Sequence, residues 1–542
     1  MGLDAPGGGA RGLSLSFARA LVFQISHRQF FGITERTRPM SNPNPPAPAA
    51  AEPLWCRWLL VIALAGYAIF LARHTAVVAG GSDSSGYLNS ARLFAEGRLL
   101  TDLRAPAEFG PRGSLDPMHF LPQGFFPFTD PARLTPTYPT GLPLHFALAG
   151  KFFGWTVGPW LVVLLAAIAA VGLCFAAGRE LGLTVELAAT GAVTLAAFPV
   201  FIFTSVQPLS DTLATAWTLA ALLAGLRARR ARRWALGCGV ALGMAVLVRP
   251  TNLLLAPALL VFLGLDGKKL GLFVLGGVPA AAWMAGYNHR LYGSAFSSGY
   301  GDVFAAFALP YGGPTAVHFA KWLALLLPAA LLVLPLAAWI RRDTRTRELL
   351  ALTLTFATIA GLYLFYEISH EVWWCLRFIL PAIPPLILAG LLGVEALARG
   401  PGARWPQKFR SGAALVLALW AFGNSWYWTP RLSVFMMKKY EQAYADGSLA
   451  AREKFPHDAL VLSFAFSGAL YFYSDFPVLR FDQMDAPVFA RYAALAQKAG
   501  RPLCAVLFDW EEKDAFRHCP GEWRRLTTVA NIGLWQLAAP KP

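Results

Sequence analysis

Residues 58–78 read WLLVIALAGYAIFLARHTAVV, an apolar run long enough to cross a bilayer as one helix. Further apolar runs follow it near residues 156–177, 187–206, 210–226, 234–248, 251–265, 270–287, 320–340, 349–366, 378–397 and 411–428. Together they predict an α-helical polytopic membrane protein with about eleven transmembrane helices. The two spans that flank Arg249 are short.

The composition agrees with this class. Of the 542 residues, 56% are hydrophobic and only 14% are charged, which is too little charge for a set of soluble domains. The net charge of +16 would suit a nucleic-acid-binding protein, but Lys and Arg stand in short runs between apolar segments. Nucleic acid is therefore excluded as the main partner, and the lipid bilayer is the expected environment.

The basic residues also predict the orientation of the chain. Lys and Arg collect in every second loop, at residues 227–233, 268–269, 341–347 and 399–410. Because positive residues near span ends stay on the cytoplasmic side, the amino terminus is expected in the cytoplasm. With an odd number of spans the carboxyl terminus lies outside, in a multi-pass protein of the inner (plasma) membrane.

Three regions are expected along the chain. They are a flexible cytoplasmic tail at 1–53, a transmembrane domain at 54–430 with a large extracytoplasmic loop at 80–142, and a small extracytoplasmic α/β domain at 431–542. In the last region, strands are predicted at 459–465, 477–481 and 503–508, and a helix at 486–498.

The first outward loop opens with Gly-Gly-Ser-Asp-Ser-Ser-Gly-Tyr at residues 80–87, so Asp83 lies just beyond the first span. A carboxylate in this place can take a proton from a hydroxyl group or help to hold a divalent cation. It can also, with Ser84, cap a helix over residues 86–96, and the two roles are compatible. The loop closes with Tyr138-Pro-Thr-Gly-Leu-Pro, a rigid turn back into apolar sequence.

The order of these elements resembles the GT-C membrane glycosyltransferases over residues 58–430. The closer resemblance is to the bacterial branch related to protein O-mannosyltransferases and lipid A aminoarabinose transferases. It rests on an acidic residue directly after the first span, on Tyr87 and the helix that follows, and on the Tyr-Pro-x-Gly-x-Pro motif.

The resemblance implies an inverting transferase that takes a sugar from a polyprenyl-phosphate donor in the cell envelope. The acceptor would be a lipid, a glycan or a protein on the extracytoplasmic face. Asp83 matches the acidic residue that acts as general base or lies beside a metal ion. Many relatives have Asp-Glu or Asp-x-Asp here, whereas Ser84 and Ser85 follow Asp83. The sequence thus leaves open whether Mg²⁺ or Mn²⁺ is needed, and no other cofactor is expected.

Further candidates lie at the outward ends of later spans. Asp211 begins the fourth span, as a second catalytic carboxylate or as a helix cap. Arg249 precedes Asn252 at the bilayer boundary, where a charge needs a partner such as a lipid-linked phosphate, unless the side chain snorkels to the surface.

A last cluster occupies residues 367–377, where His370, Glu371 and Arg377 accompany two Trp residues. Indole rings can stack on a sugar while a guanidinium group binds phosphate, although an aromatic belt at the membrane surface also explains the Trp residues. We therefore expect catalysis by Asp83 and Asp211. The expected substrate- or phosphate-binding residues are Tyr87, Tyr138, Arg249, Asn252, His370, Glu371 and Arg377.

Two other functions are compatible with a polytopic chain. A transporter or lipid flippase would place polar groups near the bilayer midplane and contain internal repeats, whereas the polar candidates here lie at the outward boundary. A noncatalytic scaffold would leave Asp83 far from Arg249 and Arg377 in the folded protein.

Overall fold

The computed structural model describes residues 54–111, 115–341, 345–399 and 407–538. The tail expected at residues 1–53 lies outside this part. In the described part each predicted span falls on a helix or on a pair of helices. They are α2 (Leu54–His74), α4 (Gly141–Glu180), α5 (Val185–Ala197), α6 (Pro199–Ser205), α7 (Ser210–Ala228), α8 (Arg233–Val248), η4 (Pro250–Leu255), α9 (Ala256–Leu263), α10 (Gly267–Tyr292), α11 (Gly312–Leu326), α12 (Ala330–Ile340), α13 (Thr346–Tyr363), η8 (Trp373–Ala382), α14 (Ile383–Ala398) and α15 (Gln407–Arg431).

Two of the predicted spans are not continuous helices. The axis bends by 61° between α5 and α6, at Pro199, and by 100° between α11 and α12, next to Pro328. Proline causes such breaks because it lacks the backbone N–H and its ring collides with the preceding turn. In the described residues, three helices are long and apolar enough to cross a membrane, and five if each bent pair is one span. The count of about eleven spans stays a prediction.

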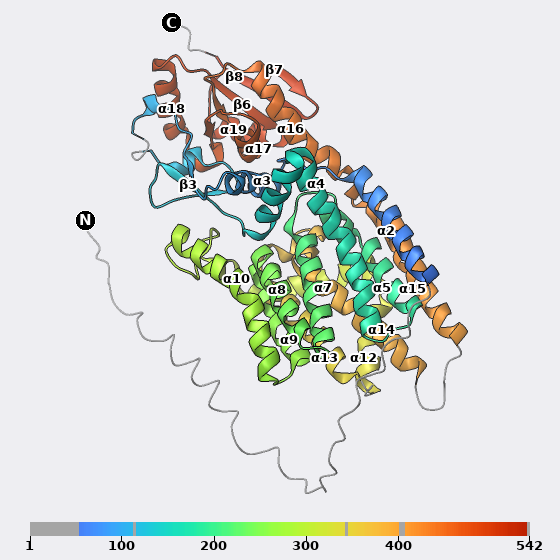
Figure 1. Cartoon of the computed structure of the whole chain (residues 1–542). Helices are drawn as coiled ribbons and strands as arrows, with labels where there is room; N and C mark the ends of the chain where they lie inside the picture. The colour runs from blue at the N-terminus through green and yellow to red at the C-terminus, as the bar shows by residue number, and fades with distance from the viewer. Residues whose placement is uncertain (1–53, 112–114, 342–344, 400–406, 539–542) are drawn as a thin grey trace, which may run out of the picture. The chain divides into compact units, whose positions relative to one another are not determined.

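The helices pack through close backbone contacts. α8 and α10 lie side by side (Figure 1), and a Cβ on Gly239 or Gly276 would collide with the backbone of the facing helix. Small residues at such positions let two helices approach, which favours dispersion contacts between them. This packing holds α8, which also packs against α7, and α8 ends directly before the candidate residue Arg249.

The first large loop, between α2 and α4, folds as helix α3 (Ser82–Ala95) followed by a three-stranded antiparallel sheet, in the order β1-β3-β2. Its strands are β1 (Thr101–Asp102), β2 (Phe125–Pro127) and β3 (Arg133–Pro136). The helix expected at 86–96 therefore begins earlier, at Ser82, and the strands were not predicted because they are short.

The C-terminal region is a five-stranded mixed sheet with helices, in the strand order β5-β4-β6-β8-β7. Its elements are α16 (Met437–Lys454), β4 (Leu460–Leu462), α17 (Ser467–Tyr473), β5 (Val478–Leu479), α18 (Ala486–Lys498), β6 (Leu503–Phe508), α19 (Asp509–His518), β7 (Trp523–Val529) and β8 (Ile532–Leu537). β4 pairs with β5 and β6 in parallel, and β8 is antiparallel to β6. The three predicted strands and the predicted helix are confirmed.

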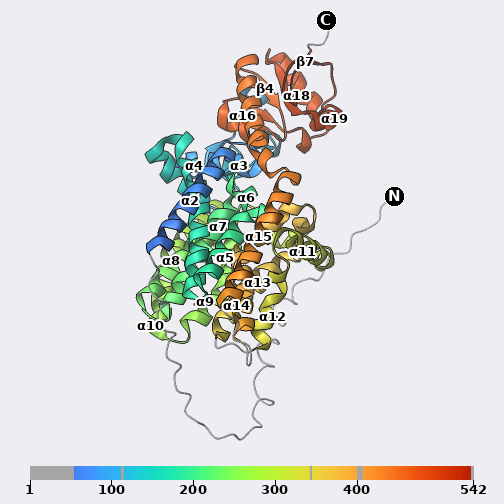
Figure 2. The ribbon, with the colours of Figure 1, turned by 90° about the vertical axis from the view of Figure 1, so that its right-hand side faces the viewer.

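The first loop and the C-terminal region share one hydrophobic core. Phe120 of the loop packs edge-on against Tyr492 of α18, with ring centroids 5.3 Å apart, and His119 Nδ1 lies 2.9 Å from the Tyr492 hydroxyl. On α3, the Asn89 amide donates to the carbonyl of Gly468, at 3.0 Å. Figure 2 shows α3 at the junction between the apolar helices and the C-terminal sheet. The C-terminal domain therefore holds in place the loop that carries Asp83.

Candidate active site

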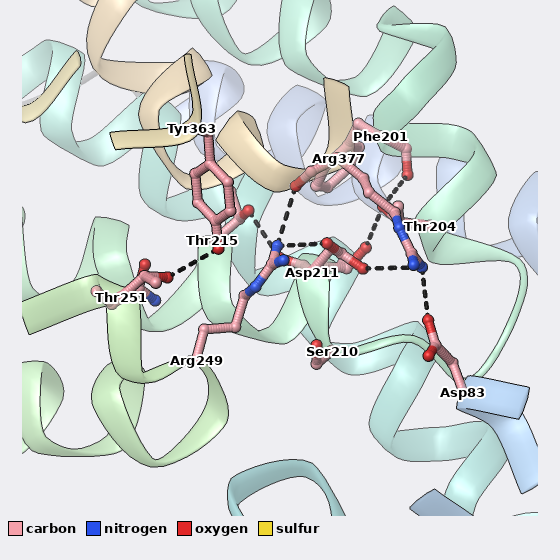
Figure 3. Close-up of polar contacts among 12 residues, drawn as sticks. Asp83, Phe201, Thr204, Ser210, Asp211, Thr215, Arg249, Thr251, Tyr363 and Arg377 are labelled. Atoms are coloured by element: carbon pink, nitrogen blue, oxygen red, sulfur yellow. Dashed lines mark hydrogen bonds and ion pairs between the residues drawn. The ribbon is translucent and has the colours of Figure 1, made fainter. Parts of the chain in front are cut away.

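Four charged residues from separate elements meet at the end of the helical domain (Figure 3). Arg377 Nη1, in η8, lies 2.8 Å from Asp83 Oδ2 of α3 and 3.9 Å from Asp211 Oδ2 of α7. Asp211 Oδ1 in turn accepts a hydrogen bond from Arg249 Nη1 at 2.5 Å. The result is an alternating row of charges, Asp83, Arg377, Asp211 and Arg249, which we call the charge row. The scaffold hypothesis predicted that Asp83 would lie far from Arg249 and Arg377, and the charge row does not agree with it.

The helix-cap interpretation is wrong for both carboxylates. α3 starts at Ser82 after the N-cap residue Gly81, and Asp83 is already in its first turn. α7 starts at Ser210, with Asp211 in its first turn, and neither helix has a side-chain cap hydrogen bond. Both carboxylates still benefit from the positive end of their helix dipoles, but their oxygen atoms contact guanidinium groups instead of backbone amides.

Burial distinguishes the members of the charge row. The Asp211 side chain is 3% exposed, Arg249 13%, Arg377 16% and Asp83 29%. Asp211 is therefore the buried centre that holds both arginines, and Asp83 is the carboxylate most open to a substrate. The two carboxylates balance the two guanidinium groups, as the high cost of an unpaired buried charge requires.

The Arg377 guanidinium group keeps capacity for a further anion. Arg377 Nε is buried and, among the described residues, has no hydrogen-bond partner. Arg249 Nη1 also donates to the Arg377 carbonyl at 3.0 Å, which ties the two arginines together. The Phe378 ring lies within cation–π range of both, at 5.7 Å from Arg249 and 5.4 Å from Arg377. A buried donor without a partner is uncommon and is a natural contact for a phosphate oxygen.

Two tyrosines form hydrogen bonds with serines in the first turns of α3 and α7, the turns that carry Asp83 and Asp211. Tyr87 donates from its hydroxyl to Ser210 Oγ at 3.0 Å, and the Tyr138 hydroxyl lies 2.7 Å from Ser82 Oγ. The two rings are 4.9 Å apart, and a Cβ on Gly86 would overlap the Tyr138 ring. Burial, together with the charge of the nearby Asp83, raises the pKa of both tyrosines, so both hydroxyls stay neutral hydrogen-bonding groups.

The side chains of three other predicted binding residues have no hydrogen bond or ion pair with the charged groups of the charge row in the described residues, although the Asn252 backbone N–H donates to the Arg249 carbonyl at 2.9 Å. The Asn252 amide donates to the carbonyl of Ala245 at 3.1 Å and so closes the end of α8. His370 stacks on Tyr311 with ring centroids 6.0 Å apart, and its Nδ1 is buried without a partner among the described residues. Glu371 is exposed. Their roles in substrate binding stay predictions.

Some residues near the site were not predicted. The Tyr363 hydroxyl lies 3.1 Å from Thr251 Oγ1, and the ring of Tyr300 packs edge-on against Tyr138. Glu441 of α16 lies against the Gly80-Gly81 pair. The glycine pair was the signal for Glu441, because two adjacent glycines mark a place where another group comes close to the backbone.

The residues do not fit a divalent cation. In the part of the chain that the structure describes, no three His, Cys, Asp or Glu residues are grouped as metal ligands. The carboxylates of Asp83 and Asp211 are already paired with guanidinium groups. Mg²⁺ and Mn²⁺ usually need several oxygen ligands, so no step proposed below uses a metal ion.

Comparisons with known proteins agree with the fold. Residues 136–276 match the family model described as dolichyl-phosphate-mannose-protein mannosyltransferase. ArnT from Cupriavidus metallidurans bound to undecaprenyl phosphate is similar with a TM-score of 0.55 and 14% identity, over 89% of this chain and 98% of that one. The apo state of the same protein gives a TM-score of 0.53 and 15% identity, over 90% and 99%.

The arabinofuranosyltransferase AftD from Mycobacteria is similar with a TM-score of 0.50 and 13% identity, over 89% of this chain and 40% of that one. No curated protein matches the chain by sequence. The fold class, a polytopic helical domain with a small C-terminal sheet, is confirmed. So is the predicted resemblance to the GT-C glycosyltransferases related to protein mannosyltransferases and ArnT.

Proposed function

We propose that the protein is a membrane glycosyltransferase that moves a sugar from a polyprenyl-phosphate donor to a hydroxyl group of an envelope acceptor. The acceptor is a lipid, a glycan or a protein, and the site faces the extracytoplasmic side of the inner membrane. The observation that carries the proposal is the charge row, in which the accessible carboxylate of Asp83 lies beside Arg377, whose buried Nε has no hydrogen-bond partner among the described residues. The similarity to ArnT, whose structure holds undecaprenyl phosphate, supports a donor of this chemistry.

The two arginines suit the leaving group. When the bond between the anomeric carbon and the phosphate oxygen breaks, negative charge grows on the phosphate. Guanidinium groups already fixed in place by Asp211 stabilise that charge more than they stabilise the ground state, and this lowers the barrier. We therefore assign Asp211 to holding Arg249 and Arg377, and not to proton transfer, because its carboxylate is buried between them.

Asp83 suits the general base. Without substrate its carboxylate is paired with Arg377 at 2.8 Å. When the donor phosphate binds to Arg377, Asp83 is released to accept the proton of the acceptor hydroxyl, whose oxygen attacks the anomeric carbon from the face opposite the phosphate. The reaction then inverts the configuration at this carbon. The donor phosphate thus uncovers the base that the second substrate needs.

The experiment is transfer of labelled sugar from a panel of polyprenyl-phosphate sugars by the purified protein in lipid, with and without chelator. The variant is Asp83→Asn, which keeps the size of the side chain, and the control is Asp102→Asn, an exposed carboxylate of the same loop. We expect the wild type and the control to transfer or hydrolyse the donor, with or without chelator, and Asp83→Asn to be inactive although folded. A folded wild-type protein that is silent across the panel would favour transport or a scaffold instead.

A further inference from the structure

A groove with several basic residues lies beside α3, on the opposite side of this helix from Asp83. Asp83 and Arg92 are nine residues apart on α3, and at about 100° of rotation per residue their side chains leave the helix on opposite faces. Arg92 lines two neighbouring cavities, of about 580 Å³ and about 290 Å³. The larger cavity lies within the range of about 300–1,000 Å³ that is typical of small-molecule sites.

The two cavities join α3 to two other parts of the chain. The larger cavity lies between the end of α3 and α4, which pack side by side (Figure 1), and Gly150, Lys151 and Trp155 of α4 line it. The smaller cavity lies between α3 and the C-terminal region, and Arg104, Arg452 and His457 line it together with residues 471–476. We call the two cavities together the basic groove.

The positive charges of the basic groove exceed the negative ones. Its lining contains four cationic side chains, those of Arg92, Arg104, Lys151 and Arg452. The two carboxylates that also line it are already paired, Glu96 with Arg98 at 3.1 Å and Asp475 with Arg104 at 3.7 Å. The other three cations form no ion pair within the described residues. The basic groove is therefore suited to an anion.

The Arg92 side chain is fixed in place at the centre of the groove. Its Nη1 donates to the carbonyl of Phe472 in α17 at 2.7 Å, and its guanidinium group lies 3.3 Å from the centroid of the Phe472 ring. The Trp155 ring lies on another side of the same guanidinium group, at 5.9 Å. These contacts hold the group without neutralising its charge, so an anion can bind to it with little loss of side-chain entropy.

The rim of the larger cavity is apolar. Phe152 and Phe153 of α4 are 72% and 60% exposed. Directly after them the helix breaks at Gly154, which has a φ of 76°, and α4 then continues as an apolar helix. Exposed rings beside Lys151 and Trp155, at the start of an apolar helix, are typical of a segment at the surface of a membrane. We therefore expect the groove to open at the level of the lipid headgroups.

We propose that the basic groove binds the headgroup of an anionic phospholipid of the surrounding bilayer. The phosphate lies between Arg92 and Lys151, since guanidinium and ammonium groups are the usual partners of phosphate oxygens. The acyl chains lie beside Phe152 and Phe153, where they cover rings that are exposed in the protein alone. The site is separate from the charge row, and the proposal goes beyond the proposed function without depending on it.

A bound lipid also has an effect on the folded protein. Arg92 connects α3 to α17, so an occupied groove stabilises the junction between the apolar helices and the C-terminal sheet. A ligand that binds only the folded state raises the stability of that state by mass action. Phosphatidylglycerol should therefore raise the unfolding temperature of the wild type more than phosphatidylcholine does.

The test measures the binding of phosphatidylglycerol and of phosphatidylcholine to the purified full-length protein by native mass spectrometry. The variants are Lys151→Gln and Arg92→Gln. The matched control is Lys439→Gln, an exposed lysine near the start of α16 that lines neither cavity.

We expect the wild type to bind phosphatidylglycerol about tenfold more tightly than phosphatidylcholine. One basic residue near a membrane surface contributes about a fivefold attraction for an anionic lipid. Lys151→Gln should therefore weaken the binding of phosphatidylglycerol by about fivefold and reduce its effect on the unfolding temperature, whereas Lys439→Gln should change the affinity by less than about twofold. If Arg92→Gln does not fold, because it loses the bond to Phe472, Lys151→Gln decides alone.

Three results would overturn the proposal. The first is equal affinity of the wild type for the two lipids. The second is an equal loss in Lys151→Gln and Lys439→Gln, which would indicate attraction by the whole basic surface instead of a site. The third concerns another occupant. Lys151→Gln should bind polyprenyl phosphate as tightly as the wild type does, and weaker binding would mean that the groove holds the glycosyl donor.

Discussion

We predict that Asp211 and Arg249 are strongly coupled in their contribution to the free energy of unfolding, and their burial and separation indicate the size of the effect. Asp211 is 3% exposed and its Oδ1 lies 2.5 Å from Arg249 Nη1, so Asp211→Ala leaves a buried guanidinium group without its main partner. Breaking one side of a buried pair typically costs about 3–5 kcal/mol of unfolding free energy. Arg377 keeps its contact with Asp83, so the loss falls mainly on Arg249.

The assay is a double-mutant cycle on unfolding in mixed micelles, with Asp211→Ala, Arg249→Ala and the double variant. Once Arg249 is absent, removal of Asp211 no longer strands that charge, so the double variant should be more stable than the sum of the single losses predicts. We expect a coupling energy of about 2–3 kcal/mol. The matched control is the partly exposed pair Arg232 and Asp266, 3.7 Å apart, where coupling should stay under about 1 kcal/mol. Additive losses at the buried pair would refute the reasoning.

Three further outcomes are expected. Burial raises the pKa of Glu511 to about 7 although two backbone N–H groups donate to it, at 2.9 and 3.0 Å. Because the pKa of this carboxyl is higher in the folded than in the unfolded state, its contribution lowers the free energy of unfolding of the protein as the pH rises from about 4.5 to about 7. Glu511→Gln should therefore flatten that part of the pH dependence of unfolding. Gly86→Ala should lower kcat because the added methyl group overlaps the Tyr138 ring and meets the Gly124 backbone, which displaces the helix that carries Asp83, whereas Gly66→Ala, with nothing within 4 Å of the added carbon, should leave kcat unchanged; equal rates would refute this. Tyr87→Phe removes the hydrogen bond to α7 and should cost about 1 kcal/mol of stability, measured by unfolding, with kcat lowered much less than in Asp83→Asn.

Much of the fold could be predicted because its signals are local. Apolar runs located the helices, and the strands at Leu460–Leu462, Val478–Leu479 and Leu503–Phe508 are short apolar segments between turn residues. β7 (Trp523–Val529) was missed because four of its seven residues are polar or charged and most are solvent-exposed, which resembles a loop in sequence. The bend next to Pro328 was also missed, because the hydropathy of a segment does not depend on the direction of its helix axis.

The charge row could be predicted in part for an energetic reason. Arg249, Asp211 and Arg377 stand out because charges beside apolar runs are expensive and need partners. Which residue pairs with which could not be predicted, because the pairs join α3, α7 and η8 across the fold. Glu441 itself is ordinary in sequence, as a glutamate on a polar helix. The adjacent Gly80 and Gly81 indicate only that some group comes close to the backbone there, and not which residue it is.

The most direct test of the account is equilibrium binding of a polyprenyl phosphate to wild type, Asp83→Asn and Arg377→Gln, beside the transfer rate of each. Asp83 and Arg377 form one ion pair, yet the account assigns them opposite effects on phosphate binding. Arg377→Gln should weaken binding, whereas Asp83→Asn should bind the phosphate at least as tightly as wild type, because Arg377 is released, and should transfer no sugar. Weaker phosphate binding by a folded Asp83→Asn, or transfer at the wild-type rate, would contradict the account.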